Sequence, residues 1–114
     1  MAEVGRYAYN HLDGKGGYSD GHAKVGSYLQ NAWGLYDMHG NVYELCLDWY
    51  GASTSSAAAV SNPVGPNTGW IRVLRGGDWA RGAALCRSAS RSSLTPSDFS
   101  HHYGFRIFCQ SSGR

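Results

Sequence analysis

The sequence has no apolar stretch long enough to form a transmembrane helix, which needs about 20 predominantly apolar residues. It has no run of like charges either. The formal net charge is only +2, and the arginines are spread through the C-terminal half, so the charge pattern does not favour a nucleic-acid partner. The first residues lack the basic and apolar regions of a signal peptide, and export by the general secretory route is therefore not expected.

Cysteine is also scarce. The sequence has three cysteines, Cys46, Cys86 and Cys109, and none of them forms a Cys-x-x-Cys pair of the kind that binds metal. An odd count allows at most one internal disulfide, and the spacing does not say which pair would form it. We expect these cysteines to be buried free thiols, because an unpaired cysteine usually behaves as a small apolar residue.

Helical periodicity is missing as well, whereas glycine and aromatic residues are plentiful: 16 Gly, 8 Tyr and 4 Trp. Glycine at this level is typical of tight turns and irregular loops. Alternation or apolar character predicts strands over 42–49, 71–75, 86–91 and 104–109. At 114 residues we expect one domain over 1–114, made of strands and loops with little helix.

Four segments carry a family resemblance: Asn31–Glu44, Arg72–Trp79, Cys86–Arg91 and Gly104–Arg106. They follow one another in the order found in the formylglycine-generating-enzyme, or sulfatase-modifying-factor, family, and they match only its C-terminal part. The resemblance implies an α+β, C-type-lectin-like fold with short strands and long loops. Gly76–Gly77 would then permit a turn that side chains would block, and Trp33, Trp49 and Trp79 would supply apolar area to a small core.

The family's chemistry requires two cysteines, which bind copper and oxidise a substrate cysteine. Thiolates suit Cu(I) because a soft ion prefers soft sulfur ligands. The resemblance places these two cysteines at Ala83 and Ser88, and Cys86 alone does not form a two-coordinate site. The histidines are not spaced like the clustered iron ligands of related enzymes. We therefore expect a protein that is not an enzyme and binds no copper. A copper-dependent cysteine oxidase with displaced ligands is the alternative.

The resemblance also implies a structural calcium ion in the loop from Asp37 to Glu44. Its ligands would be the side chains of Asp37 and Glu44 and the backbone carbonyls of Gly40 and Val42. Carboxylates and carbonyls are the hard oxygen ligands that calcium prefers. The competing interpretation is that Asp37 caps a turn and Glu44 pairs with an arginine, and the sequence leaves both open.

The segment between Trp79 and Gly104 has an unusual composition: it contains no Lys, Glu, Gln, Met or Trp, although the rest of the chain has all five. It resembles the variable region of diversity-generating-retroelement target proteins, in which adenine-directed mutagenesis changes asparagine codons and cannot produce those five residues. A flexible polar loop of accidental composition is the other interpretation. The resemblance places a changeable binding face within 78–103, on Asp78, Ala80, Arg81, Gly82, Leu85, Ser90, Ser92, Ser93, Leu94, Asp98, Phe99, Ser100, His101, His102 and Tyr103.

Together these features predict a non-catalytic binding protein. We expect a receptor-recognition module displayed by a phage or a cell, with a protein or glycan ligand and no nucleic acid. Phe99, His101, His102 and Tyr103 would be its energetic anchors, since large side chains with few rotatable bonds bind at low entropic cost. A structural domain of a virion or cell surface, in which the same segment packs against neighbouring chains, is the alternative from a different class. The oligomeric state stays open.

Overall fold

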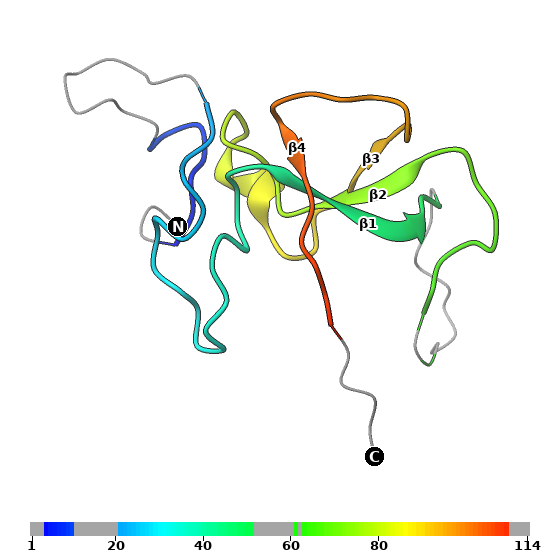
Figure 1. The fold of residues 1–114 in the computed structure, drawn as a ribbon, viewed down its shortest axis with the longest axis horizontal. Helices are drawn as coiled ribbons and strands as arrows, with labels where there is room; N and C mark the ends of the chain where they lie inside the picture. Colours follow the sequence, from blue (N-terminus) through cyan, green and yellow to red (C-terminus); the bar gives the residue numbers. More distant parts are fainter. Residues whose placement is uncertain (1–3, 11–20, 52–60, 62, 110–114) are drawn as a thin grey trace.

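In a computed structural model, residues 4–10, 21–51, 61 and 63–109 are described, and they consist of strands and loops with one short helical turn. The elements in chain order are β1 (Tyr43–Trp49), β2 (Arg72–Arg75), the 3-10 helix η1 (Ala83–Cys86), β3 (Ser92–Leu94) and β4 (Tyr103–Gly104) (Figure 1). This confirms the expected strand-and-loop architecture. Within the described ranges, no helix is long and apolar enough to cross a membrane.

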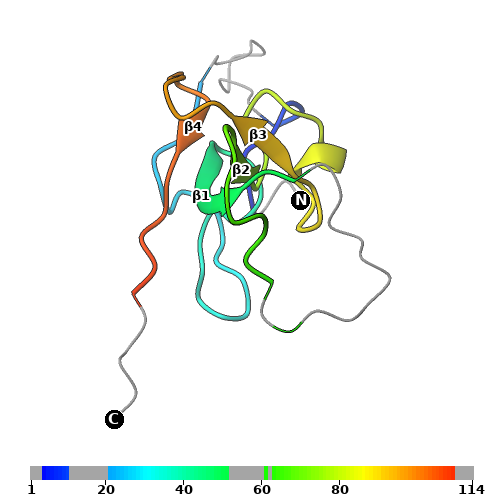
Figure 2. The ribbon, with the colours of Figure 1, turned by 90° about the vertical axis from the view of Figure 1, so that its right-hand side faces the viewer.

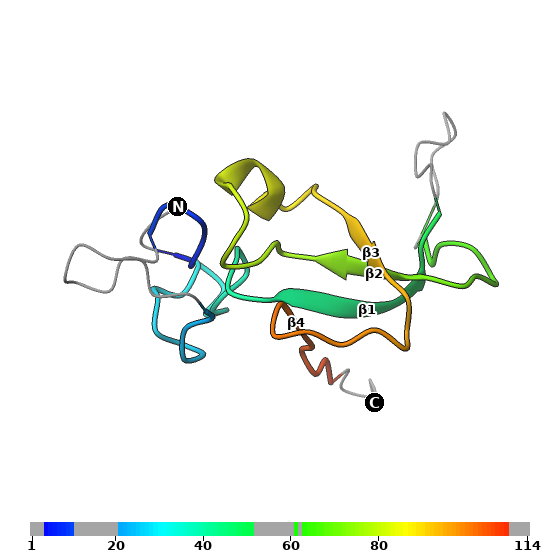
Figure 3. The ribbon, with the colours of Figure 1, turned by 90° about the horizontal axis from the view of Figure 1, so that it is seen from above.

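The four strands form one sheet in the order β3-β2-β1-β4 (Figure 3). β2 pairs antiparallel with both β1 and β3, whereas β4 pairs parallel with β1. Leu74 is opposite Leu45 on β1 and Ser92 on β3, so these side chains share one face of the sheet. The strands predicted over 42–49 and 71–75 are therefore confirmed to within one residue at their starts.

The strand predicted over 86–91 is wrong. Residues Ala83–Cys86 form η1, and the next strand begins only at Ser92. The physical reason lies on β2: the guanidinium of Arg75 donates to the carbonyls of Ser88 at 2.6 Å and Ser90 at 2.9 Å. Those carbonyls accept hydrogen bonds from a side chain, and the backbone turns there instead of extending along the sheet.

The strand predicted over 104–109 is wrong over most of its length. Only Tyr103–Gly104 pairs with β1, and the described residues that follow run away from the sheet (Figure 1, Figure 2). Phe105, Ile107 and Phe108 are consequently exposed. Alternation in a sequence marks an extended segment, but it does not say whether a neighbouring strand is there to pair with it.

The core is small, and its main buried cluster lies on one face of the sheet. Tyr43, Leu74 and Leu94 form its buried cluster, and Tyr103 packs against them. Trp79 is also buried, as predicted, while Trp49 is half-buried under the guanidinium of Arg72, 3.4 Å from the ring centroid. The prediction for Trp33 is wrong, because this side chain is 85% exposed.

Guanidinium groups donate to backbone carbonyls at several places in the fold. Arg75 holds the carbonyls of residues 88–90, and Arg91 donates to the carbonyl of Gly51 at 3.2 Å. Arg6 donates to the carbonyl of Gly21 at 2.8 Å, and Arg72 donates to that of Leu47. Hydrogen bonds from a charged donor are stronger than neutral ones. In a domain with so little regular structure, cations on backbone oxygens therefore add to the backbone hydrogen bonds of the turns and the sheet.

The turn at the end of β2 depends on glycine, as the sequence indicated. Gly76 and Gly77 both have positive φ, 89° and 76°. A Cβ added to Gly77 would also lie 2.6 Å from Sγ of Cys86 and 2.9 Å from its Cα. The backbone therefore passes directly against the end of η1, and this close approach sets where residues 78–82 emerge.

Candidate functional site: the 78–103 face and a neighbouring pocket

The structure divides the fifteen predicted face residues by their exposure. Seven are exposed: Ala80, Arg81, Leu85, Ser93, Asp98, Phe99 and His101. Six are half-buried: Gly82, Ser90, Ser92, Ser100, His102 and Tyr103. The remaining two, Asp78 and Leu94, are buried, with 1% and 8% exposure, and contribute no surface.

The burial of Leu94 follows from its place on β3. It pairs with Arg72 and lies on the same face as Leu74, so it packs into the core cluster. Tyr103 packs there too and is only partly available as an anchor. Phe99, by contrast, is 94% exposed in the loop between β3 and β4. The exposed aromatic surface of the segment is therefore centred on Phe99 and His101.

Three aromatic rings stack where the two ends of the segment meet. His102 lies on Trp79 with ring centroids 4.8 Å apart and planes at 11°, and His101 lies 4.4 Å from His102. Trp79 also contacts His101 at 5.7 Å. Offset and stacked aromatic pairs stabilise beyond their apolar area. The stack joins the residues after β2 to those before β4, which the sequence pattern did not reveal.

Asp78 lies beneath this stack. Its Oδ1 accepts a hydrogen bond from the backbone N–H of Ala80 at 3.0 Å. Its Oδ2 lies 2.9 Å from Nδ1 of His102 and 3.7 Å from Nε of Arg81. The resemblance placed Asp78 on the changeable face. In the structure Asp78 is buried and contacts His102, which lies 24 positions further along the chain.

The thiol of Cys86 is poorly suited to bind a metal or to act as a nucleophile. Cys86 is 1% exposed, and burial, followed by the negative charge of Asp78, raises the pKa of its thiol. A raised pKa disfavours the thiolate, which is the form that binds metal or acts as a nucleophile. Ala83 and Ser88, the positions that the resemblance assigns to the catalytic cysteines, are exposed and carry no sulfur.

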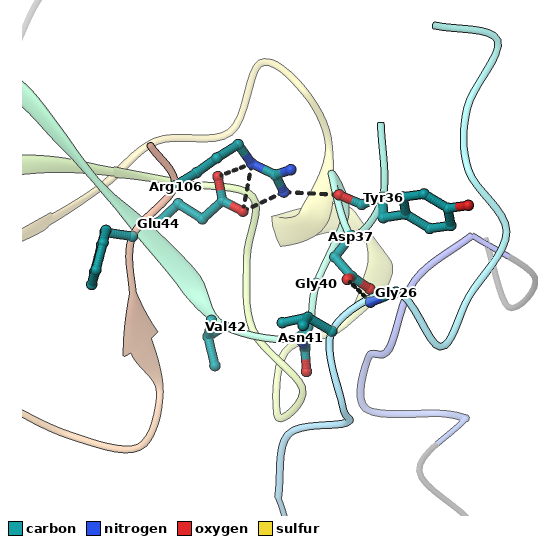
Figure 4. Close-up of a pocket in the computed structure, with 10 residues that line it drawn as sticks. Gly26, Tyr36, Asp37, Gly40, Asn41, Val42, Glu44 and Arg106 are labelled. Atoms are coloured by element: carbon teal, nitrogen blue, oxygen red, sulfur yellow. Dashed lines mark hydrogen bonds and ion pairs between the residues drawn. The ribbon is translucent and has the colours of Figure 1, made fainter. Parts of the chain in front are cut away.

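A second feature lies beside the sheet: a cavity of about 330 Å³ lined by all four predicted calcium ligands, Asp37, Gly40, Val42 and Glu44 (Figure 4). Asp37 and Gly40 have positive φ, 55° and 82°, so this loop turns sharply around the cavity. Oδ2 of Asp37 accepts from the N–H of Gly26 at 2.7 Å, while Oδ1 is buried without a hydrogen-bond partner.

Glu44 is already paired within this cavity. Both of its carboxylate oxygens accept from Arg106, whose Nη2 lies 2.6 Å from Oε1 and whose Nε lies 3.0 Å from Oε2 (Figure 4). These hydrogen bonds raise the pKa of Arg106. Asp37 thus accepts from the amide of a turn, Glu44 is paired with an arginine, and Oδ1 of Asp37 is a buried carboxylate oxygen with no hydrogen bond. Across the described residues, no three His, Cys, Asp or Glu side chains cluster as a metal site.

Comparison with known proteins gives a consistent family. The family model described as "Sulfatase-modifying factor enzyme 1-like domain" matches residues 1–110. The chain is 40% identical over 102 residues to the formylglycine-generating enzyme of Thermomonospora curvata, which covers 84% of this chain and 33% of that protein. It is 48% identical over 84 residues to the serine/threonine-protein kinase pkn1 of Chlamydia pneumoniae, covering 72% of this chain and 14% of the kinase. The chain therefore spans a third or less of the length of these relatives.

Two solved structures share the fold. Treponema denticola variable protein 1 superposes with a TM-score of 0.76 at 31% identity, over 90% of this chain and 34% of that one. PvdO from Pseudomonas aeruginosa superposes with a TM-score of 0.74 at 31% identity, over 92% of this chain and 38% of that one. Both agree with the C-type-lectin-like fold expected from the sequence.

Proposed function

Because the chain belongs to the sulfatase-modifying factor enzyme 1-like domain family, yet carries Ala83 and Ser88 where the resemblance places the two cysteines of the family's chemistry, we propose that it is a ligand-binding protein that uses the face formed by residues 78–103. The contact between Asp78 and His102 carries this proposal. It brings together the two ends of a segment that looks diversified in sequence, so that Arg81, Phe99 and His101 belong to one surface. Recognition commonly lies on loops held by a rigid scaffold.

The finer proposal is that this face is diversified by a retroelement. Two observations support it: the residue restriction between Trp79 and Gly104, and the structural similarity to Treponema denticola variable protein 1. The ligand would be a protein or a glycan on another surface, and the protein would be displayed by a phage or a cell. Phe99 and His101 are its exposed anchors, with His102 stacked behind them.

Sequencing the DNA that flanks the gene tests the diversification. We expect a near-copy of the stretch encoding Arg72 to Cys109, which differs only where the copy has adenine, beside a reverse-transcriptase gene. Intact flanks without such a copy would contradict diversification. They would leave open whether the face binds.

Binding itself needs a second test. Soluble protein is applied to a glycan array and to a panel of purified bacterial surface proteins, and any positive is repeated with Phe99→Ala and His101→Ala. Both variants remove exposed side chains, so folding should persist, and we expect at least about a tenfold loss of affinity if these residues are hot spots. Trp70→Ala, which alters another exposed aromatic residue outside the segment, is the control. Equal loss in the control would contradict the assigned face.

A cysteine oxidase is the second candidate, because the relatives include formylglycine-generating enzymes. It would have to use Cys86, whose buried thiol lies between the positions assigned to the family's pair. Tight Cu(I) binding that disappears in Cys86→Ser, together with oxidation of a cysteine peptide, would favour this function. A structural role in a virion appendage would instead bury residues 92–103 in a symmetric oligomer.

We further propose that the pocket beside the sheet holds a structural calcium ion. The side chain of Asp37 fits this role, because its buried Oδ1 lacks a partner in a cavity that Gly40, Val42 and Glu44 also line. Calcium takes carboxylate and carbonyl oxygens. Glu44 would have to share its carboxylate between the ion and Arg106.

A further inference from the structure

Asp78 is a buried carboxylate at the centre of the proposed face. It is 1% exposed, and a buried charge costs free energy unless other charges or hydrogen bonds compensate it. Only Oδ1 has a hydrogen bond at good geometry, from the N–H of Ala80. Oδ2 and Nδ1 of His102 lie 2.9 Å apart, but their alignment is not that of a hydrogen bond. Their attraction therefore depends on charge more than on direction.

We propose that Asp78 is a positioning residue that holds the tip of the face, residues 99–103, through His102, and that it holds the tip more tightly when His102 carries a proton. The importance of this clamp rests on the proposed function, because the tip presents Phe99 and His101. Neutral His102 gives Asp78 only a dipole, whereas a protonated ring gives it an opposite charge at ion-pair distance.

The surroundings of His102 favour a tip that is held more tightly when this ring is protonated. Its backbone carbonyl accepts from the N–H of Tyr43 at 2.8 Å, which fixes the chain where β4 begins. Its ring lies flat on Trp79, and a cation over an indole face is stabilised electrostatically. Protonation would thus strengthen two contacts of the same ring, one with a buried carboxylate and one with a buried aromatic side chain.

Other charged and titratable groups lie near Asp78 and His102. Arg81, at 3.7 Å from the carboxylate, already supplies some positive charge and opposes a second one. His101, 4.4 Å away ring to ring, would repel a charged His102 when it is itself protonated. Burial and then Asp78 raise the pKa of both Tyr43 and Cys86, so both stay neutral over the range in which histidines titrate.

The pH dependence follows in sign. Histidine ordinarily changes its charge between about pH 5 and 8. A proton taken up by His102 as the pH falls adds a charge opposite Asp78, and the tip becomes more ordered. Loss of that proton as the pH rises removes the charge attraction of the pair, and the tip loosens. A ligand that binds Phe99 and His101 would therefore meet a more ordered site when His102 is protonated.

Hydrogen exchange in the ligand-free protein tests the clamp. Protection of the amides of residues 99–103, corrected for intrinsic rates, is measured at about pH 5.5 and about pH 8. We expect protection to be at least about threefold higher at the lower pH, as for a charge-assisted contact. Asp78→Asn, which keeps the shape of the side chain and removes its charge, should abolish this difference. Asp98→Asn, which alters an exposed carboxylate of the same loop, should leave it intact.

His102→Gln serves as the second variant, because His102 is half-buried and its replacement should fold even if Asp78→Asn does not. Equal protection at both pH values in the unmodified protein would overturn the proposal. So would a pH dependence that survives in His102→Gln. Because no ligand is present, a negative result here contradicts the clamp alone, whereas failure of the binding panel contradicts the proposed function.

Discussion

Arg106 and Glu44 are 62 residues apart in sequence and form a bidentate ion pair that joins the segment after β4 to β1. The same guanidinium donates to the backbone carbonyl of Tyr36 at 2.8 Å. One side chain thus connects the loop at Tyr36, the strand β1 and the segment that follows β4.

Removing the charge of Glu44 should loosen this junction. Because both side chains are partly exposed, at 36% and 24%, solvent weakens the pair, and we expect Glu44→Gln to lower the free energy of unfolding by only about 0.5–1 kcal/mol. Chemical denaturation measures the change. Asp48→Asn, another carboxylate on β1 but exposed, should change stability little. An equal effect of both would argue against a specific role for the pair.

Gly77→Ala should be strongly destabilising. The added methyl group would contact Sγ and Cα of Cys86 at less than 3 Å, and the backbone has positive φ, so the cost should be at least about 2 kcal/mol. Gly82→Ala is the matched control, since its Cβ would meet nothing within 4 Å. Thermal unfolding of the two variants should differ by several degrees, and similar melting temperatures would contradict the close approach.

The stability should fall in alkaline solution through Cys86. Its pKa is raised above the usual 9.0 by burial and by Asp78, so the folded state favours the neutral thiol. This contribution is fully present below the pKa of the unfolded chain and is lost as the pH rises through about 9 and beyond. Unfolding free energies measured from about pH 8 to 10.5 should fall less steeply in Cys86→Ala. Cys109→Ser, at an exposed position, should keep the slope.

Calcium should stabilise the protein if the pocket binds it. At a calcium concentration about 100 times the dissociation constant, the expected gain is about 2.7 kcal/mol, or a rise of several degrees in melting temperature. The comparison is metal-free protein with and without added calcium. Asp37→Ala should abolish the rise, while Asp98→Ala should not. An unchanged melting temperature in the unmodified protein would show that the loop holds no calcium.

Prediction from the sequence succeeded where side-chain pattern alone determines structure. The alternation in 42–49 marks the strand β1, although Tyr43 is its one buried residue, and the apolar run before Gly76 marks β2. It failed at 86–91, where the guanidinium of Arg75 takes up the carbonyls, and beyond Gly104, where pairing ends. The local periodicity of a sequence shows neither a side-chain contact from another strand nor whether a neighbouring strand is present.

The sequence predicted which segment forms the candidate face, but it did not predict which residues of that segment are buried. Leu94 could have been placed in the core if β3 had been recognised, because its register opposite Arg72 assigns its face. Asp78 could not, since nothing in a segment that looks free to vary marks one carboxylate as internal. The link to His102 exists only once the chain has folded, because it crosses 24 residues and two loops.

The fastening of residues 88–90 by Arg75 has a consequence for how such a surface could change over time. Arg75 lies on β2, outside the segment. Its guanidinium donates to backbone carbonyl oxygens, which every amino acid has. Substitutions at Ser88, Ala89 or Ser90 would therefore exchange the outward groups without removing the acceptors. The hydrogen bonds from Arg75 therefore do not depend on which side chains residues 88–90 carry, and the scaffold should tolerate substitutions there.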